Sequence, residues 1–400
     1  MAPLRDIPCV KVAHLADPHL GARQYHRQTS AGINQREADV ARAFRLAVDG
    51  VIAAAPDLVV VAGDLFHSVR PTNAAIVFAF RQVQRLREAL PGAPIVLVAG
   101  NHDTPRSVET GSILRLFEEL GVDVAADQAR RLVYPKLDVA VLAVPHQALV
   151  SERPPLRPEG SEGRQLLVLH GEIEGVFPFD RSSVEYGGAV IGLNELAPTE
   201  WSYVALGHYH VRHQVAPRAW YAGALEYVSP NLWGELADEA RHGHRNKGWL
   251  LVDLDAGTVA PQPIEPARAI LDLPPIPGEG MAAAALDRLI ADRLAEVPGG
   301  IADKILRLRV YDVPRHVGRE LDHTAIRGFK AEALHFHLDV RRPEIQRAVG
   351  VGAPGRRQPL PELVRDYLSR RPLPAEIDRE AFVRLGGELL DGVERDLAGA

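Results

Sequence analysis

The stretch IVLVAGNHDTP, residues 95–105, changes abruptly from four aliphatic side chains to glycine, asparagine, histidine and aspartate. A short aliphatic run that ends at a glycine is typical of a buried strand followed by a tight turn. The polar side chains would then stand at the end of that strand, where open α/β sheets place their ligands. The stretch therefore predicts an element of the fold and a chemical site together.

The same arrangement, an aliphatic run followed directly by polar side chains, recurs along the chain. Five such stretches supply the candidate site residues Asp17, His19, Asp64, His67, Asn101, His102, His170, His208 and His210. A single aspartate or histidine after a strand is more often a turn former or a hydrogen-bonded surface group. Five groups in order, all of metal-ligand type, are hard to explain by packing, and we expect them to converge at one sheet edge.

Short aliphatic runs alternate with segments of helical spacing over the first two thirds of the chain. We predict strands at residues 10–17, 57–64, 94–101, 137–145, 164–172, 203–210 and 248–255. Between the first two strands, apolar residues from Ala41 to Ala55 recur at spacings of three and four, which predicts a helix. Continuous aliphatic strands joined through helices indicate an α/β layered core.

The chain is expected to contain more than one domain. Residues 261–280 hold six prolines and predict an extended linker or edge segment. Beyond it we predict a helix at 282–297, a strand at 303–313, a helix at 317–333 and a strand at 334–342, then a linker at 348–361 and two helical segments. The predicted domains are therefore 1–265, 266–345 and 346–400.

Composition limits the classes of function. The formal net charge of −6 excludes a globally basic protein that coats nucleic acid, although a local basic groove stays possible. Cys9 is the only cysteine, so neither an intrachain disulfide nor a thiolate zinc cluster can form. No apolar run of about 18 residues is present, and the first residues lack the pattern of a signal peptide. We therefore expect a cytoplasmic protein without a membrane span.

Carboxylate, imidazole and amide groups without thiolate suit manganese, iron or zinc, and manganese is the first choice. Seven candidate ligands are too many for one tetrahedral ion and leave room for two ions that share Asp64. Two ions about 3.5 to 4 Å apart can clamp a phosphate and activate a water for in-line attack. The residues thus predict phosphoester hydrolysis.

The stretches DPHLG, GDLFH, GNHD, LHGE and GHYH, in that order, resemble the signature of the calcineurin-like metallophosphoesterases. Within that superfamily, DPHLG, GDLFHSVRP and the small α+β unit resemble the SbcD nucleases, whose eukaryotic and archaeal relatives are the meiotic-recombination-eleven nucleases. The resemblance implies a layered metallophosphoesterase β-sandwich flanked by helices, a smaller α+β capping domain that binds DNA, and C-terminal helices. Pro18 departs from the residues common at its position, but the ligand spacing is kept.

The resemblance also implies a role for each site residue. The first ion would be held by Asp17, His19 and His210, the second by Asn101, His170 and His208, and Asp64 would bridge them. His102 would stabilise the transition state and protonate the leaving group, while Asp103 would orient His102 or the turn. His67 would help to place the DNA strand, and its alternative is a surface histidine before Pro71.

The function implied by the resemblance is a two-metal, manganese-dependent DNA nuclease of double-strand break repair. It would act as a double-strand 3′–5′ exonuclease and as an endonuclease on single strands and hairpins, in the nucleoid, as a homodimer with an SbcC-like ATPase of SMC type. A phosphodiesterase or phosphatase that acts on nucleotides or phosphoproteins would share every metal ligand. A metal-bearing scaffold that only recruits the ATPase is disfavoured by the intact ligand set and by His102.

Each of three further stretches has two interpretations. A run of eight arginines either contacts DNA or belongs to a solvated linker. These are Arg341, Arg342, Arg347, Arg356, Arg357, Arg365, Arg370 and Arg371. The terminal segment from Ile377 to Val393 would dock on the ATPase or pack on its own capping domain. His242 and His244 would lie in a solvated loop or be additional ligands.

Overall fold

The computed structural model describes residues 9–105, 111–160, 163–176, 187–243, 247–343, 360–371, 373 and 377–398. The chain divides into two compact units, Met1–Arg342 and Pro343–Ala400. All nine candidate site residues lie in the first unit. His244, Arg347, Arg356 and Arg357 lie outside the described residues.

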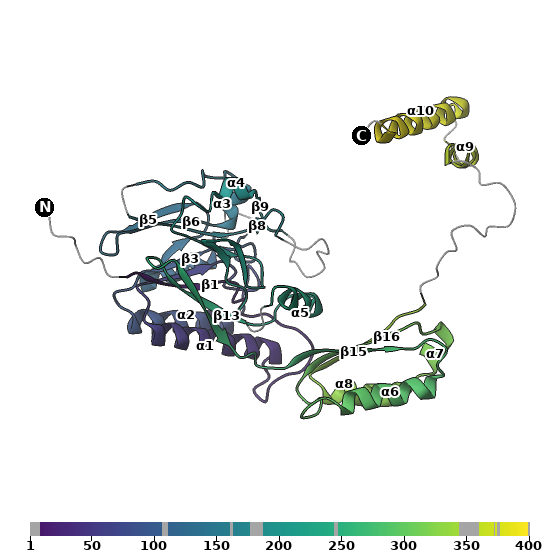
Figure 1. The fold of residues 1–400 in the computed structure, drawn as a ribbon, viewed down its shortest axis with the longest axis horizontal. Helices are drawn as coiled ribbons and strands as arrows, with labels where there is room; N and C mark the ends of the chain where they lie inside the picture. The colour runs from purple at the N-terminus through teal and green to yellow at the C-terminus, as the bar shows by residue number, and fades with distance from the viewer. Residues whose placement is uncertain are drawn as a thin grey trace. The chain divides into compact units, whose positions relative to one another are not determined.

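Two six-stranded sheets form the body of the first unit (Figure 1). The first sheet has the order β14-β13-β1-β2-β3-β4, with β1 (Lys11–Leu15), β2 (Leu58–Ala62), β3 (Ile95–Val98), β4 (Asp123–Ala125), β13 (Lys247–Asp253) and β14 (Thr258–Ile264). The second has the order β11-β12-β10-β7-β6-β5, with β5 (Arg130–Tyr134), β6 (Val139–Val144), β7 (Arg164–His170), β10 (Tyr203–Gly207), β11 (His213–Ala216) and β12 (Ala219–Tyr221). In the first sheet, β1 to β4 are parallel, and β13 pairs antiparallel with both β1 and β14. In the second sheet, the four central strands are parallel, and the edge strands β11 and β5 are antiparallel to their neighbours.

Alternate side chains of each strand enter different apolar layers. In β2, Val60 packs between the two sheets, whereas Val59 and Val61 pack against the helices. The helical layer contains α1 (Gln35–Ala54), α2 (Asn73–Ala89) and the 3-10 helix η2 (Ile113–Leu120). The far face of the second sheet is covered by short elements, namely α3 (His146–Val150), α4 (Leu193–Leu196), β8 (Glu172–Ile173) and β9 (Val190–Ile191). The predicted layered sandwich flanked by helices is confirmed.

A separate three-stranded parallel sheet follows, with its own apolar core. It is built from β15 (Ile270–Pro277), β16 (Ile305–Tyr311) and β17 (His335–Val340), together with α6 (Ala283–Ala295), α7 (Arg315–Glu320) and α8 (His323–Glu332). The proline-rich stretch 261–280 forms β14 and β15, which are edge strands of the two sheets that they join. The domain boundary at residue 265 falls between them and stays a prediction, because both sheets belong to the first unit.

The predicted helix at 317–333 was wrong as one element, because the structure forms α7 and α8 with a break between them. The Asp322 side chain accepts hydrogen bonds from the backbone N–H groups of Thr324 and Ala325, so it caps a new helix. In the second unit, α9 (Leu360–Arg370) contacts α10 (Arg379–Ala398). Helix α10 continues through Gly386, where a Cβ would collide with Leu368 of α9. No described helix has the length and apolar character needed to cross a membrane.

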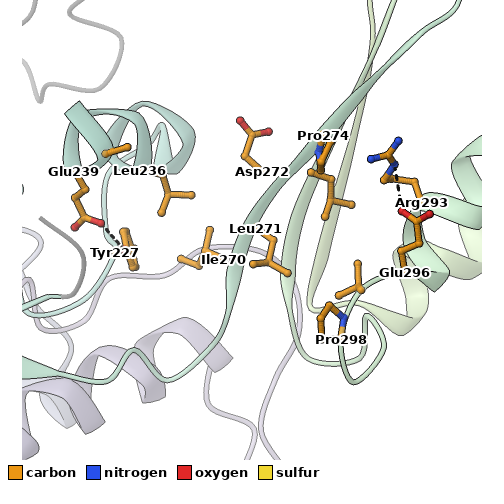
Figure 2. A pocket seen from close by; sticks show the side chains of 13 residues that line it. Tyr227, Leu236, Glu239, Ile270, Leu271, Asp272, Pro274, Arg293, Glu296 and Pro298 are labelled. Carbon is orange, nitrogen blue, oxygen red and sulfur yellow. Dashed lines mark hydrogen bonds and ion pairs between the residues drawn. The ribbon is translucent and has the colours of Figure 1, made fainter. Parts of the chain in front are cut away.

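Helix α5 (Leu232–Arg241) and β15 border a groove of about 670 Å³ (Figure 2). Glu239 lines this groove and accepts a hydrogen bond from the Tyr227 hydroxyl. The buried ammonium of Lys247 contacts Glu235 and lies 2.8 Å from Glu239 Oε1. Burial would lower the pKa of Lys247, but the charges of the two glutamates raise it. The cluster is thus a charged structural element of the fold.

Replacing Lys247 by methionine would leave two buried carboxylates without their shared cation. Removing one partner of a buried ion pair costs about 3 to 5 kcal/mol, so we expect the free energy of unfolding to fall by that amount in urea denaturation. The control is Arg85→Met, whose pair with Asp49 is about half exposed and should contribute less than about 1 kcal/mol. Equal losses in the two variants would contradict a special role for the buried cluster.

Candidate metal centre

The five polar groups predicted from the sequence meet at one edge of the sandwich. Each follows or ends a central strand: β1, β2 and β3 of the first sheet, and β7 and β10 of the second. Four of the side chains, Asp17, His19, Asp64 and His170, are completely buried. Ionisable groups are seldom fully buried unless they are paired or bind metals, so this burial itself indicates a site.

The turns that present these side chains are strained. Asp17, His19, Asp64 and His208 all have positive φ angles, of 51°, 48°, 50° and 102°. A residue other than glycine in this region costs of order 1–3 kcal/mol, and such strain gathers at functional sites. Gly207 precedes His208, and a Cβ at Gly207 would collide with the backbone oxygen of Ala62 in the opposite sheet. The glycine therefore allows the two sheets to approach at the site.

The residues proposed for the first ion lie together. Asp17, His19 and His210 form a buried group whose ligand atoms all lie within 4.8 Å of one another. The Nε2 atoms of His19 and His210 are 3.0 Å apart. Two nitrogens that each lie about 2.1 Å from one ion can be at most about 4.2 Å apart, so this separation would allow both to be ligands of the same ion. Ser229 Oγ lies 3.1 Å from His210 Nδ1, which leaves Nε2 as the ligand atom.

The residues proposed for the second ion converge on one amide oxygen. Asn101 Oδ1 lies 2.9 Å from His170 Nε2 and 3.1 Å from His208 Nδ1. His170 Nδ1 donates to the backbone oxygen of Ala62 at 2.9 Å, because a carbonyl only accepts. This hydrogen bond fixes the tautomer in which Nε2 is available to a metal.

Asp64 lies between the two groups. Its Oδ2 is 3.7 Å from His19 Nε2 and 3.2 Å from His170 Nε2. Oδ2 is buried, yet no hydrogen bond of satisfactory geometry reaches it from the described residues. Oδ1 accepts from the backbone N–H of His102 at 2.9 Å. A buried carboxylate with one unsatisfied oxygen between two imidazole groups fits a bridging ligand, so the donor set fits two divalent ions.

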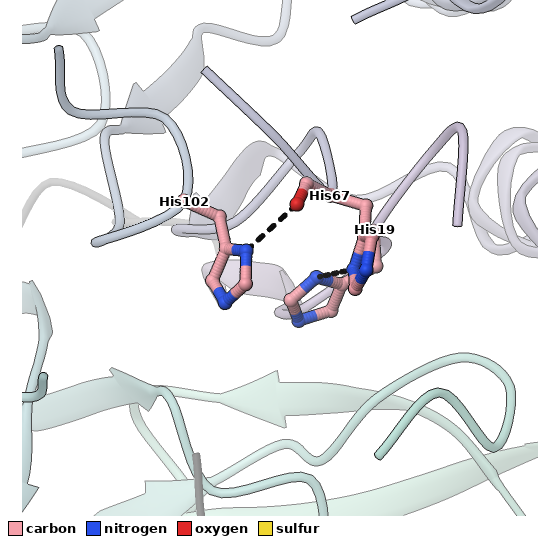
Figure 3. A group of neighbouring side chains, drawn as sticks. All are labelled: His19, His67 and His102. Atoms are coloured by element: carbon pink, nitrogen blue, oxygen red, sulfur yellow. Dashed lines mark hydrogen bonds between the residues drawn. The ribbon is translucent and has the colours of Figure 1, made fainter. Parts of the chain in front are cut away.

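His102 and His67 stand beside this donor set, close to His19 (Figure 3). His102 Nδ1 donates to the backbone oxygen of His67 at 2.7 Å, because a carbonyl oxygen only accepts. The rings of His67 and His102 are stacked with centroids 5.3 Å apart, and both line a cleft of about 550 Å³. His67 Nδ1 lies 3.3 Å from His19 Nδ1. The structure therefore brings all nine predicted residues together.

Among the contacts that the structure defines, the Asp103 carboxylate binds the backbone of two turns and not the His102 side chain. It accepts from the backbone N–H groups of Leu65 and Phe66 at 3.0 Å and of Gly100 at 3.2 Å. These bonds join the turn after β2 to the turn after β3. Asp64 and Asn101, one from each turn, are thereby held side by side.

The comparisons with known proteins agree with this geometry. The family model described as calcineurin-like phosphoesterase matches residues 10–221, which is more than half of the chain and contains every candidate ligand. The chain belongs to the calcineurin-like phosphoesterase family. It is therefore a metal-dependent phosphoesterase, whose candidate metal ligands are the buried groups at the strand ends.

Several relatives carry the name DNA double-strand break repair protein Mre11. Those from Sulfurisphaera tokodaii and Saccharolobus solfataricus are 29% and 30% identical over 50% and 51% of this chain, and 49% and 50% of their own lengths. The relative from Methanocaldococcus jannaschii is 28% identical over 63% of this chain and 64% of its own length. The chain thus spans about half to two thirds of the length of these relatives.

His146 also belongs to the cleft of this phosphoesterase, although the sequence analysis did not single it out. It follows β6, lines the cleft together with His102, and is only 8% exposed. The available signal was the same as elsewhere, a polar side chain after the aliphatic run 137–145. His242, by contrast, packs against His213 with ring centroids 4.3 Å apart and joins no described group of candidate ligands.

Metal loading of this phosphoesterase should release a proton. Burial would lower the pKa of His170, but the negative charge of Asp64, whose Oδ2 lies 3.2 Å from His170 Nε2, raises that pKa to about 9. Burial would raise the pKa of Asp64, but His170 holds it well below its usual range. At pH 7 the metal-free His170 is therefore protonated, and it must lose that proton before Nε2 can bind an ion.

We expect manganese binding at pH 7 to release about one proton from this pair, and affinity to rise on the order of tenfold per pH unit between pH 6 and 8. Calorimetry in two buffers with different ionisation enthalpies measures the proton directly. Heats that do not depend on the buffer would contradict the paired state of His170.

Proposed function

We propose that the chain is a manganese-dependent DNA nuclease of double-strand break repair. It would cleave duplex ends as a 3′–5′ exonuclease, and single strands and hairpins as an endonuclease. The observation that carries the proposal is the convergence of seven ligand-type side chains, six of them buried, on one edge of the sandwich, with His102 beside them at the cleft. The Mre11 names of the relatives favour DNA over other phosphoesters.

The residues of the chain would divide the chemistry between them. Asp17, His19 and His210 would hold one ion, Asn101, His170 and His208 the other, and Asp64 both. When bound, the two ions would activate a water and neutralise charge on the phosphate. His102, with Nδ1 committed to the His67 carbonyl, would use Nε2 to stabilise the transition state and protonate the leaving oxygen. His67 would position the strand beside it.

The three-stranded sheet supports a nucleic-acid substrate. Its β16 presents Arg307, Arg309 and Tyr311 on the face opposite the apolar core, and the Arg341 guanidinium lies over the Tyr311 ring at 5.6 Å. Arg307 and Arg309 share Asp272, so the face is basic only by a small excess. We propose that this sheet is the DNA-binding capping domain, 266–345, as arginine and aromatic groups suit phosphates and bases.

The second unit supports a protein partner. Helices α9 and α10 and their connection expose four large apolar side chains by 46–64%, namely Tyr367, Ile377, Leu385 and Leu389. Amphipathic helices of this kind bind a hydrophobic groove or another helix. We propose that they dock on an SbcC-like ATPase of SMC type, and that the nuclease works as a homodimer.

The test is a cleavage assay of the purified full chain with manganese. We expect it to degrade linear duplex DNA and to nick hairpins, and also to hydrolyse bis(p-nitrophenyl) phosphate slowly. Nucleotides and a phosphoserine peptide are assayed in parallel. Hydrolysis of these two substrates without any DNA cleavage would overturn the proposal in favour of a phosphodiesterase or phosphatase.

A further inference from the structure

His146 is tied to both halves of the metal centre through the backbone. It follows β6, which is parallel to β7 with Val144 opposite Leu169, the residue before the proposed ligand His170. Its own N–H donates to the backbone oxygen of Ala99 at 2.9 Å, at the start of the turn that carries Asn101. The position of the ring at the site is therefore set by both sheets.

The imidazole ring of His146 is enclosed, but one of its nitrogens has no hydrogen-bond partner in the described part of the chain. The side chain lines the cleft together with His102, yet the residue is only 8% exposed. Its Nδ1 is buried and has no hydrogen-bond partner among the residues that the structure describes. Because Nδ1 is enclosed, Nε2 is the ring nitrogen that can meet a ligand in the cleft.

The surroundings of His146 favour a neutral imidazole that can donate a hydrogen bond to an anion. Burial, followed by the charge of His170, lowers the pKa of His146 to about 4. The ring is thus uncharged at pH 7 and has one N–H to donate. No described group of candidate ligands includes His146, and no carboxylate is among the residues that line the cleft. The described residues that line the cleft therefore offer His146 no anionic acceptor.

We propose that His146 is a substrate-contacting residue, whose imidazole donates a hydrogen bond to a non-bridging oxygen of the phosphodiester in the cleft that it shares with His102. Because no described group fixes the proton on the enclosed Nδ1, Nε2 can carry it toward the substrate. This deepens the proposed function and rests on it for DNA as the substrate, but the contact itself requires only a phosphodiester.

The test compares His146→Leu, which cannot donate, with His146→Gln, which can. A hydrogen bond to a charged group is lost in the leucine variant, so kcat/KM for bis(p-nitrophenyl) phosphate and for hairpin DNA should fall about 10- to 100-fold. The glutamine variant should recover most of that loss. Both variants should still bind two manganese ions, and the affinity of the manganese-loaded protein for inorganic phosphate should fall in the leucine variant alone.

The matched control is His14→Leu. His14 is completely buried, its Nδ1 lies 2.9 Å from the Tyr203 hydroxyl, and its Nε2 is also without a hydrogen-bond partner in the described part of the chain. It does not line the cleft. We therefore expect this variant to lower the melting temperature while kcat/KM and phosphate affinity stay at the parent values.

Three results would overturn the proposal. His146→Leu with the parent kcat/KM and phosphate affinity would show that the ring does not contact substrate. Loss of one manganese ion would make His146 a ligand instead. If His146→Gln does not recover activity and both variants lose melting temperature equally, the role of His146 is packing and not substrate contact. Hydrolysis of the small phosphodiester without DNA cleavage would defeat the proposed DNA substrate, while the His146 comparison would still be decided.

Discussion

Replacing His102 by leucine or serine should lower DNA cleavage about 10²- to 10⁴-fold, the range that general acid catalysis contributes, while both ions stay bound. The reason is that the two neighbouring residues have different contacts. Asn101 Oδ1 lies close to His170 and His208, whereas His102 Nδ1 donates to the His67 carbonyl. Initial rates on hairpin DNA and metal analysis of the same sample provide the two measurements.

Asn101→Ala is the matched comparison, because it should weaken one ion as well as cleavage. DNA binding should survive in the His102 variants, since phosphate contacts elsewhere supply most of the affinity. A His102 variant that cleaves at the parent rate with both ions bound would refute the catalytic role. His102 also lies in a group with His19 and His67 whose ligand atoms are close enough for an ion, so loss of metal would recast it as a ligand.

Replacing Asp64 by asparagine should abolish ordered binding of at least one ion. The substitution removes the one negative charge shared by two adjacent dications, at an oxygen that lies between His19 and His170. The backbone N–H of His102 can still donate to the remaining amide oxygen, so the turn should persist. Metal analysis after dialysis gives the stoichiometry, and circular dichroism verifies the fold.

Asp39→Asn serves as a control for this variant, because Asp39 is also a buried carboxylate but pairs with Arg36 away from the proposed ligands. It should keep two ions. Two tightly bound ions in the Asp64 variant would contradict the assignment of Asp64 as the bridge.

The sequence was informative wherever local chemistry decides structure. Aliphatic runs bury both faces of a central strand, so the strands and the polar side chains at their ends could be predicted together. The grouping of seven ligands around two ions came from the resemblance, and the distances at Asn101 and between His19 and His210 are compatible with it. The identity of the metal stays a prediction, because imidazole and carboxylate groups suit several ions.

What the sequence could not supply depends on contacts between distant segments. The Asp103 carboxylate accepts hydrogen bonds from the backbone N–H groups of Leu65 and Phe66. The position of Asp103 next to His102 in the sequence does not reveal this role. The sequence shows His146 as a polar residue after an aliphatic run, but its place beside His170 depends on β6 lying beside β7, and strand order is a property of the assembled sheet. The break before Asp322 was missed for a different reason, since a single N-cap signal inside a periodic run was outweighed by the period.

The most direct test of the metal centre is anomalous diffraction from a crystal of the full chain grown with manganese. The account predicts two peaks about 3.5 to 4 Å apart, both in contact with the Asp64 carboxylate. One peak should be bound by His19 and His210, and the other by Asn101 and His170. A single peak, or two peaks that Asp64 does not join, would contradict the two-ion site.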